Sequence, residues 1–314
     1  MLDLIRGTFA FKYIREYIGR FQVKINPEKE VDRCYFSKFK KHWNPNNPQD
    51  LIEKIFWMEL YSDTSVWSLC ADKYRMREYI EKMGLGQYLP KNYGHWENVN
   101  DIDFEALPDE FVLKTNNGCG TVMVVKEKKD LDIRKTKKAL KQWLRMPYGS
   151  QNAQLHYMAI KPCVIAEELL CQDEYLNSIS PNSMVDFKVW CLNGEPENIL
   201  LVYDRNKDGY CLDLYDTEWN RIDDNFNKKW HSEFREESVL RPDCLMEMLS
   251  IAKKIAEPFP EVRVDFYIVN GKPVIGELTF STGYGYFTYD YYKYMGGKVD
   301  LSKVKQTRTT PSKK

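Results

Sequence analysis

Paired strands joined by short turns constrain the fold of this chain more than any other feature. Apolar runs flank turns rich in Gly and Asn in three stretches, residues 110–125, 184–205 and 261–280, and this pattern is typical of β-hairpins. Helical patterns separate the hairpins, without the regular strand–helix–strand repeat of a parallel sheet. The sequence therefore predicts an α+β fold, with lobes of largely antiparallel sheet and a mainly helical N-terminal segment.

The composition suits a globular chain with a sizeable core. Of the 314 residues, 43% are hydrophobic and 14% aromatic, enough for two or three lobes. Lys plus Arg and Asp plus Glu both number 46, so no overall field attracts nucleic acid and we expect no nucleic-acid partner. The eight cysteines include no CxxC motif, which suits buried thiols in a reducing compartment and predicts a cytoplasmic protein.

The two ends of the chain differ from its body. Apolar residues recur at helical spacing in residues 1–21, at Ile5, Phe9, Tyr13, Ile14, Tyr17 and Ile18. Charges interrupt this segment too often for a signal peptide or a membrane-spanning helix. We expect a helix that docks on its own domain; weak, peripheral association with a membrane surface is the alternative. Residues 301–314 are polar and basic, so we expect a disordered tail.

The last hairpin carries charges in strands that otherwise look like core. Alternation places Arg263 and Asp265 on one face, and Glu277 and Thr279 share a face of the second strand. Two carboxylates about 4 Å apart repel by roughly 4 kcal/mol at an effective dielectric constant of 20, so a shared site needs a cation. Arg263 would make a structural ion cluster. Mg²⁺ would instead make a nucleotide site, because hard oxygen ligands hold it alongside phosphates.

The turn at Asn270-Gly271 bears directly on this choice. The dipeptide is typical of a two-residue type I′ turn, which would pair Val269 with Lys272 and put Asp265 and Glu277 on opposite faces of the sheet. A shared metal site requires a register that is shifted by one residue. We therefore predict an odd-numbered loop or an equivalent bulge in this hairpin.

A second group of candidate residues surrounds the first hairpin. Lys114 precedes the loop "TNNGCG", where Gly118 and Gly120 let backbone N–H groups approach a ligand closely, as phosphate-binding loops require. No Gly-Lys-Ser/Thr follows, so the loop is not a Walker A motif. Lys73 lies in the first turn of a predicted helix that Asp72 caps. Taken alone, Lys73 would be an ordinary surface lysine, and Lys114 an edge-strand charge.

The order of these residues along the chain resembles the ATP-grasp superfamily. The succession is Lys73, then Lys114 with its glycine-rich hairpin, then "AEELLCQDE", "DFKVWCLNG" and "RVDF…GELTF". The resemblance implies an ATP-grasp fold, with nucleotide held between two α+β lobes. It assigns residues 71–170 to a nucleotide-binding lobe and residues 171–300 to a metal and catalytic lobe, after an N-terminal segment of residues 1–70.

The resemblance also implies which residues contact ATP. They are Lys73, Lys114, Gly118, Gly120, Glu167, Glu168, Leu170 and Glu174. The two lysines would contact the phosphates, and the glycine-rich loop would close over them. The family's hinge and ribose acids are commonly seven residues apart, as Glu167 and Glu174 are, which would leave the backbone of Leu170 to bind the adenine edge. Glu168 is the competing hinge residue.

On the catalytic side, the resemblance implies that Asp265 and Glu277 hold Mg²⁺. Thr279 stands where the family usually has a magnesium-binding asparagine, and its hydroxyl is a weaker ligand. Arg263 corresponds to a cation near the transferred phosphate. Lys188, in "DFKVW", falls where related enzymes direct an Arg or Lys at phosphate or acceptor.

Within the superfamily, several stretches are most similar to the TupA-like branch, which is associated with teichuronopeptide and capsular polysaccharide biosynthesis. They are "DFKVWCLNGEPENILLVYDR", "YDTEWNRI" and "VRVDFYIVNGKPVIGELTF". The similarity implies acceptor-side roles for Asp204, Arg205, Asp216 and Trp219, although two surface turns would also account for them. Gly283 and Gly285 lie among tyrosines and would form a substrate loop, with aromatic core packing as the alternative.

The activity implied is ATP- and Mg²⁺-dependent ligation of a small-molecule or saccharide carboxylate to an amine acceptor, through an acyl phosphate. A glycosyltransferase is the first alternative, but it would need an Asp-x-Asp motif at the end of an apolar strand. The formal matches, at residues 101–103 and 130–132, follow polar residues instead. The second alternative is a non-catalytic polysaccharide-binding protein on the same fold.

Overall fold

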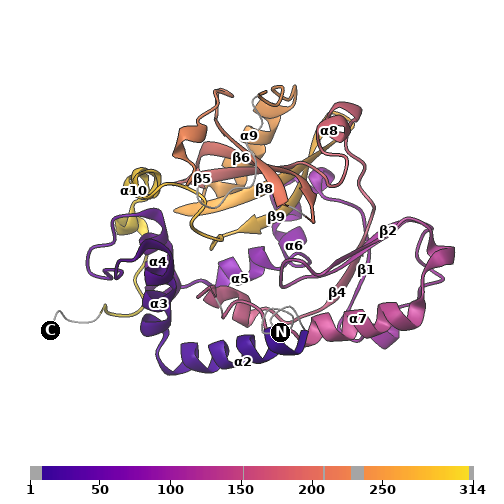
Figure 1. Cartoon of the computed structure of the whole chain (residues 1–314), viewed down its shortest axis with the longest axis horizontal. Coiled ribbons are helices and arrows are strands. Elements are labelled where there is room, and N and C mark those ends of the chain that lie inside the picture. The colour runs from indigo at the N-terminus through magenta and orange to yellow at the C-terminus, as the bar shows by residue number, and fades with distance from the viewer. Residues whose placement is uncertain (1–8, 151, 208, 228–236, 311–314) are drawn as a thin grey trace. The chain divides into compact units, whose positions relative to one another are not determined.

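The computed structural model describes residues 9–150, 152–207, 209–227 and 237–310, which form two compact units (Figure 1). The four-stranded unit comprises residues 1–34, 64–76 and 90–169, and the five-stranded unit comprises residues 35–63, 77–89 and 170–314. Each unit is assembled from segments that are far apart in the sequence. Domain boundaries at residues 70, 170 and 300 remain a prediction.

The four-stranded unit holds an antiparallel sheet with the strand order β1-β4-β2-β3. Its strands are β1 (Asn92–Trp96), β2 (Phe111–Thr115), β3 (Val122–Val125) and β4 (Val164–Glu167). Its helices are α2 (Phe9–Ile25), α5 (Ser65–Ala71) and α7 (Ile133–Arg145), with the 3-10 turns η2 (Val99–Asp101), η3 (Lys128–Asp130) and η4 (Leu155–Ala159). Helices α3 (Pro27–Phe39) and α6 (Met76–Lys82) continue from this unit into the other.

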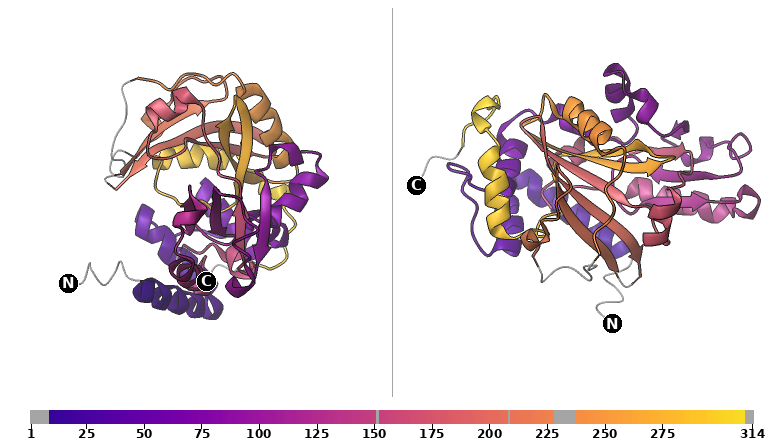
Figure 2. Two further views of the ribbon diagram at one scale, coloured as in Figure 1. Left: turned by 90° about the vertical axis from the view of Figure 1, so that its right-hand side faces the viewer. Right: turned by 90° about the horizontal axis from the view of Figure 1, so that it is seen from above.

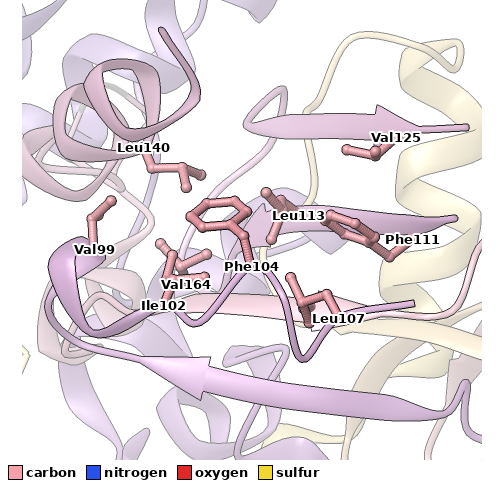
Figure 3. Packing of buried hydrophobic residues seen from close by; sticks show 10 residues of the cluster. Val99, Ile102, Phe104, Leu107, Phe111, Leu113, Val125, Leu140 and Val164 are labelled. Atoms are coloured by element: carbon pink, nitrogen blue, oxygen red, sulfur yellow. The ribbon is translucent and has the colours of Figure 1, made fainter. Parts of the chain in front are cut away.

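An apolar cluster holds this unit together (Figure 3). Phe111 and Leu113 of β2 and Val164 of β4 are fully buried in it, and Leu140 of α7 closes it. Because side chains alternate across a strand, Lys114 lies on the face of β2 away from this cluster. The core therefore fixes which face of the sheet presents the lysine.

The five-stranded unit contains a second antiparallel sheet, with the order β7-β6-β5-β8-β9. Its strands are β5 (Asp186–Leu192), β6 (Glu195–Asn206), β7 (Gly209–Asp216), β8 (Glu261–Val269) and β9 (Lys272–Thr279). Its helices are α4 (Leu51–Tyr61), α8 (Glu174–Ile179), α9 (Leu245–Ala256) and α10 (Tyr289–Lys298), with the 3-10 turns η1 (Gly86–Tyr88), η5 (Asp223–Asn225) and η6 (Leu301–Lys303). Helix α9 packs on β5, β6 and β8 (Figure 2).

Helices α4 and α10 pack closely because one residue has no side chain. Helix α4 begins with a capping box, in which the Asp50 Oδ1 accepts hydrogen bonds from the N–H groups of Ile52 and Glu53, each at 2.9 Å. A Cβ atom at Gly296 of α10 would lie 2.5 Å from the Asp50 carbonyl carbon. Only glycine allows this approach, so the sequence of α10 is matched to the start of α4.

The structure confirms the antiparallel α+β architecture and all three predicted hairpins. The helix predicted from Asp72 begins later, at Met76. Asp72 nevertheless caps the turn before it, because its Oδ1 accepts from the N–H groups of Tyr74 and Arg75 at 2.9 and 3.1 Å. Lys73 therefore lies in this turn and not in the first turn of the helix.

The prediction for the C-terminal tail needs correction. Residues 301–307 of the expected tail have defined structure, because the Thr307 N–H donates to the Tyr61 carbonyl at 2.7 Å and η6 precedes it; residues 311–314 lie outside the described residues. At the other end, α2 docks on its own unit as predicted, because Arg20 donates to the Met158 carbonyl and Ser150 to the Glu16 carbonyl. The described apolar side chains Ile14, Tyr17 and Ile18 are exposed, so the helix does not dock through them. Ile5 lies outside the described residues. No helix in the described parts of the chain is long and apolar enough to cross a bilayer.

Candidate functional site

The hairpin of β8 and β9 is closed by a two-residue turn. Asn270 and Gly271 have φ angles of 52° and 71°, and Val269 pairs with Lys272, as in a type I′ turn. The predicted odd-numbered loop is therefore wrong. If the register continued from this turn without interruption, Asp265 would face Gly276 and the two carboxylates would point to opposite faces.

A bulge in β9 restores the alignment of the two acids. Phe266 pairs with Ile275, but the next pair joins Asp265 to Glu277, so Gly276 is an extra residue in β9. The predicted equivalent bulge is thus present. Asp265 and Glu277 become direct cross-strand partners on one face of the sheet, where their side chains are close neighbours.

The ring of Tyr267 explains why the bulged residue is glycine. A Cβ atom at Gly276 would lie 3.0 Å from the Tyr267 Cε2 and 3.4 Å from the Asp265 carbonyl oxygen. A larger residue would displace the ring or the backbone of Asp265. The glycine therefore keeps the aligned acids at their observed positions.

Arg263 lies between the two acids. Its Nε and Nη2 donate to the two oxygens of Asp265 at 2.6 and 2.7 Å, and the same Nη2 lies 3.6 Å from the Glu277 Oε1. Thr279 joins the group, because its hydroxyl accepts from Arg263 and donates to Glu277, each at 3.2 Å. The four residues that the sequence placed on one face are thus in mutual contact.

The neighbouring strands β5 and β6 add three more charges. The Lys188 Nζ lies 2.6 Å from the Asp265 Oδ2 and 3.3 Å from the Asp186 Oδ2. Arg205 reaches the same Asp186 oxygen at 2.5 Å. We call this group the charged cluster; it consists of Asp186, Lys188, Arg205, Arg263, Asp265, Glu277 and Thr279. The cluster has as many acidic as basic side chains, and all of them project from strands of the sheet.

Burial and charge together set the protonation of the cluster. Burial raises the pKa of Asp186, but Lys188 and Arg205 lower it by more, so the net pKa lies below its usual value. Burial lowers the pKa of Arg205, and Asp186 more than offsets this, so the net pKa is raised. The Asp186 carboxylate, followed by burial, raises the pKa of Tyr267 well above its usual value. Asp186 and Arg205 therefore stay ionised at neutral pH, and Tyr267 stays a neutral hydrogen-bond donor.

Trp190 and Glu261 support Arg263 from the same face. The guanidinium carbon of Arg263 lies 5.4 Å from the centre of the Trp190 ring, within the range of a cation–π contact. The indole Nε1 donates to the Glu261 Oε1 at 3.0 Å. Glu261 is fully buried, and this burial raises its pKa well above the usual value. The Glu261 carboxyl group thus fixes the indole that lies beside the guanidinium of Arg263.

The cluster can be tested for its fit to Mg²⁺. Asp265, Glu277 and Thr279 offer hard oxygen donors, and Mg²⁺ needs only one or two protein carboxylates when phosphates supply further ligands. Arg263 holds both Asp265 oxygens, so a metal would share or replace these contacts. Within the described ranges, no three Asp, Glu, His or Cys side chains form a metal cluster. The donors therefore suit a metal that is held together with phosphates.

The four-stranded unit places both candidate lysines beside the glycine-rich hairpin. The Lys73 Nζ donates to the Gly118 carbonyl at 2.9 Å, which ties the turn before α6 to the loop. The Lys114 Nζ lies 2.5 Å from the Glu167 Oε2, and both side chains are largely buried. The structure therefore brings Lys114 and Glu167 together, across the β2–β4 pair.

Side chains outside the hairpin fix its loop. The Asn116 side chain donates to the Lys161 carbonyl at 3.0 Å and accepts from the Cys163 N–H at 2.8 Å. The Tyr148 ring covers Gly118, where a Cβ atom would lie 3.2 Å from it. Gly120 has a φ angle of 72°, which favours glycine. The base of the loop is thus anchored, and its glycines serve backbone geometry and close packing.

The other predicted nucleotide residues have different surroundings. The Glu168 Oε1 accepts from the Lys91 N–H at 2.8 Å, so this acid is tied to the start of β1, whereas Glu167 faces Lys114. In the five-stranded unit, Leu170 is half-buried and Glu174 is exposed at the start of α8. Their roles toward adenine and ribose remain predictions.

The acceptor-side candidates mostly serve local turns. The Asp216 Oδ1 accepts from two backbone N–H groups, at 2.9 and 2.8 Å, within its own turn. Trp219 stacks on Tyr215 with 4.2 Å between ring centres. Asp204 accepts from the Asn182 amide at 3.1 Å. These contacts support the surface-turn alternative; among the four candidates, Arg205 contacts the charged cluster.

The tyrosine-rich stretch after β9 packs largely inside the unit. The Gly285 N–H donates to the Tyr292 hydroxyl at 2.9 Å, and Tyr292 is fully buried. Phe287 lies 5.3 Å from the Trp190 ring, centre to centre. These contacts support aromatic core packing, and a substrate role for Gly283 and Gly285 remains a prediction.

The two Asp-x-Asp matches do not close strands. Asp101 ends η2, and Asp103 accepts from the Glu105 N–H at 3.0 Å. Asp130 ends η3, and Asp132 caps the start of α7. Their carboxylates therefore have ordinary turn and capping positions.

Several residues of these sites were missed from the sequence, among them Asp186, Tyr267 and Tyr148. Asp186 precedes Lys188 by two positions on the same strand, so strand periodicity could have placed it in the cluster. Tyr267 stands two positions after Asp265 and carries the same signal. Tyr148 lies 30 positions after Gly118, and no local pattern connects the two.

The glycine-rich hairpin loop beside two lysines and the aligned carboxylates of the second antiparallel sheet are the features on which the resemblance to the ATP-grasp superfamily rests. The chain belongs to the TupA-like ATPgrasp family, whose profile matches residues 53–299. Similar solved structures include the D-alanine–D-alanine ligase from Bacillus anthracis complexed with ATP, with 12% identity, a TM-score of 0.45, and coverage of 76% of this chain and 66% of that chain. The L-amino acid ligase from Bacillus licheniformis has 12% identity and a TM-score of 0.42. The matched region covers 71% of this chain and 43% of that chain. No curated protein matches the sequence.

Proposed function

We propose that this protein is an ATP-dependent ligase of cell-surface polysaccharide biosynthesis, which joins a carboxylate to an amine. The observation that carries the proposal is the bulge at Gly276, which pairs Asp265 with Glu277 beside Arg263 and Lys188. The ion pair of Arg263 with Asp265 lies within β8 and does not by itself require this register. Membership of the TupA-like family supports ATP as the substrate.

In the proposed reaction, a carboxylate oxygen of the acid substrate attacks the γ-phosphorus of ATP. The bond from this phosphorus to the bridging oxygen breaks, and ADP leaves. The amine nitrogen then attacks the acyl carbon, inorganic phosphate leaves, and the nitrogen loses a proton. Because the bonds change within the substrates, the protein acts by positioning and charge stabilisation.

Each unit would contribute differently. In the four-stranded unit, Lys73 and Lys114 would bind the phosphates, and N–H groups of the loop at residues 116–121 would donate to their oxygens. In the five-stranded unit, Arg263 and Lys188 would balance the negative charge of the transferred phosphoryl group. Their guanidinium and ammonium groups are already held by strands, so little reorganisation is needed.

Asp265 and Glu277, with the Thr279 hydroxyl, would hold Mg²⁺ when nucleotide is bound. The metal would supply charge neutralisation and orientation of phosphate oxygens. We assign the adenine edge to the backbone of Leu170 and the ribose hydroxyls to Glu174. Glu167 is favoured over Glu168 as the hinge acid, because Glu167 contacts the candidate phosphate ligand Lys114, whereas Glu168 accepts from the Lys91 N–H.

The proposed partners are a small-molecule or saccharide carboxylate and an amine acceptor, and Arg205 is the candidate for contacting the acceptor. We place the reaction in the cytoplasm. All eight cysteines are free thiols, and six of them are buried, which suits a reducing compartment. The balanced overall charge speaks against a nucleic-acid partner.

Ligand-dependent thermal unfolding tests the nucleotide part of the proposal. ATP with Mg²⁺ is expected to raise the melting temperature, because a ligand of the folded state stabilises by about 2.7 kcal/mol at 100 times its Kd. Nucleotide sugars should have no effect. The opposite ranking would favour a glycosyltransferase, and no shift with any nucleotide would favour the non-catalytic alternative.

The substitution Lys114→Ala tests the phosphate assignment. We expect ATP affinity to fall at least about tenfold, because a charge-assisted contact to phosphate is lost. Lys129→Ala is the matched control, since this exposed lysine of the same unit also pairs with an acid, Glu127, at 2.9 Å. Equal ATP affinity in the two variants would remove Lys114 from the site.

Isotope transfer tests the acyl phosphate. With an acid substrate whose carboxylate carries ¹⁸O, the phosphate released should contain one ¹⁸O atom per turnover, because the attacking oxygen stays on phosphorus. Phosphate without the label would contradict this mechanism even if ATP binds.

A further inference from the structure

Helix α2 turns an apolar face to solvent. Its apolar side chains Ile14, Tyr17, Ile18, Phe21 and Ile25 are between 51% and 68% exposed. Residues three and four positions apart lie on the same face of a helix, so these five form one continuous stripe, which we call the α2 stripe. A helix of a globular protein normally buries such a stripe.

The opposite face of α2 fixes this orientation. The Arg20 Nη2 donates to the Met158 carbonyl at 2.8 Å, and the Ser150 hydroxyl donates to the Glu16 carbonyl at 2.8 Å. Gly19 and Val23, on this face, are buried. Hydrogen bonds and small side chains thus attach α2 to its own unit, beside η4, and leave the stripe exposed. Helix α2 is labelled in Figure 1.

The charges of α2 indicate what covers the stripe. The helix carries four basic residues, Lys12, Arg15, Arg20 and Lys24, against one acid, Glu16, although the whole chain has no net charge. At about 100° per residue, the exposed Arg15 and Lys24 lie on opposite sides of the stripe. An apolar arc bordered by basic residues matches a lipid surface, where apolar groups enter the acyl region and cations meet anionic headgroups.

We propose that α2 is a docking surface for an anionic lipid bilayer, on which it lies in the plane of the interface. A second copy of the chain fits less well. In an antiparallel pair of stripes, each flank would carry the same basic residue from both copies, Arg15 on one side and Lys24 on the other, and no acid of α2 lies beside the stripe to balance them. The proposal does not depend on ligase activity, because binding to lipid is measured without turnover.

The test is flotation of the full chain with vesicles. Phosphatidylcholine vesicles that contain about a quarter phosphatidylglycerol should carry the protein, and pure phosphatidylcholine vesicles should carry at least about fivefold less. Raising the NaCl concentration from about 0.05 to 0.5 M should weaken binding, because salt screens the basic flanks. Failure of the wild-type chain to float with the anionic vesicles would overturn the proposal.

Matched double variants test the stripe itself. Ile18→Ser with Phe21→Ser should reduce vesicle binding at least about tenfold, because apolar area that enters the interface is lost. The control is Leu240→Ser with Met246→Ser, which removes two apolar side chains that are 65% and 63% exposed in the five-stranded unit. Equal binding by the two double variants would overturn the proposal.

Further measurements distinguish the remaining outcomes. Circular dichroism and the melting temperature should be the same in both double variants, since the replaced side chains are exposed. If the wild-type chain forms a concentration-dependent dimer that only the Ile18→Ser, Phe21→Ser variant loses, the stripe is an interface between copies and the lipid proposal is wrong. Arg15→Gln with Lys24→Gln should abolish the preference for phosphatidylglycerol while the apolar stripe remains.

Discussion

The hairpins β5–β6 and β8–β9 have turns of the same type, but the bulges that follow the turns have different roles. Each is closed by Asn-Gly with both φ angles positive, 50° and 82° in the first and 52° and 71° in the second. Each then contains one extra residue a few positions from the turn, Glu197 in β6 and Gly276 in β9. The turn residues alone therefore do not fix which side chains share a face.

The bulged residues differ in what their side chains do. Glu197 accepts hydrogen bonds from Tyr294 and Lys298 of α10, each at 2.8 Å, so the first bulge attaches a helix to the sheet. Gly276 has no side chain, and its bulge aligns Asp265 with Glu277. One register shift thus serves packing and the other serves the charged cluster.

The largest expected difference between the hairpins is at their acids. Glu277→Gln should reduce Mg²⁺-dependent ATP turnover by about 100-fold or more, because it removes a carboxylate from the proposed phosphate site. Its effect on stability should be below about 1 kcal/mol, since the side chain is 30% exposed. Turnover and denaturant unfolding measure the two effects.

The control for this variant is Glu197→Gln, at the other bulge. It should leave turnover within about twofold and lower the unfolding free energy by about 1 kcal/mol, because ties to α10 weaken. If both variants lost turnover equally, the distinction between the two bulges would be wrong.

The next effect concerns the bulge itself. Gly276→Val should cost about 1–3 kcal/mol of stability and weaken MgATP binding, because its side chain would displace the Tyr267 ring and the Asp265 backbone. Gly297→Ala in α10 is the control, since a Cβ atom there meets nothing within 4 Å. A fully stable Gly276→Val variant with unchanged MgATP affinity would contradict the role given to the bulge.

The two turns should differ by a smaller amount. Gly271→Ala should cost about 1 kcal/mol, because a side chain is strained at positive φ. Gly194→Ala should cost about 2 kcal/mol, because its Cβ atom would also lie 3.3 Å from the Glu257 Cα. Denaturant unfolding of both variants gives the comparison, and a larger loss at Gly271 would reverse it.

The smallest effect is a change in pH dependence where the two hairpins meet, at Trp190 of β5 and Glu261 of β8. Burial raises the pKa of Glu261 well above 4.5, so the folded chain binds a proton at pH values where the unfolded chain has lost it. The contribution of Glu261 to stability is therefore present at low pH and is lost as pH rises from about 4.5 through the folded pKa. Glu261→Gln should flatten this dependence and be the more stable protein at neutral pH. A steeper loss of stability with rising pH in the variant would contradict the raised pKa.

Much of the fold follows from local sequence patterns. The alternation of Val262, Val264 and Phe266 with charged residues predicts β8, and Asn-Gly predicts the turn that follows it. The need to neutralise Asp265 and Glu277 predicts a register shift, although it does not say whether a loop or a bulge provides it. The protein combines the two-residue turn with a bulge. A type I′ turn matches the twist of the strands, so the turn is kept and the register shifts further along β9.

The partners of the charged residues required the folded chain. Lys188 and Asp265 are 77 positions apart, and they meet only because β5 pairs with β8 in one particular register. Tyr148 covers Gly118 from a distant segment. The docking of α2 on its own unit was predicted, but the face through which it docks was not, because periodicity identifies an apolar face and does not say what that face contacts.

The sequence by itself determined the strands, the turns and the set of residues with phosphate chemistry, because these depend on backbone preferences and periodicity over a few positions. The tertiary structure decided which acids and bases meet, how Gly276 aligns two carboxylates, and which face of α2 is exposed. These outcomes depend on register and packing between distant segments, where a shift of one residue reverses the face on which every following side chain lies.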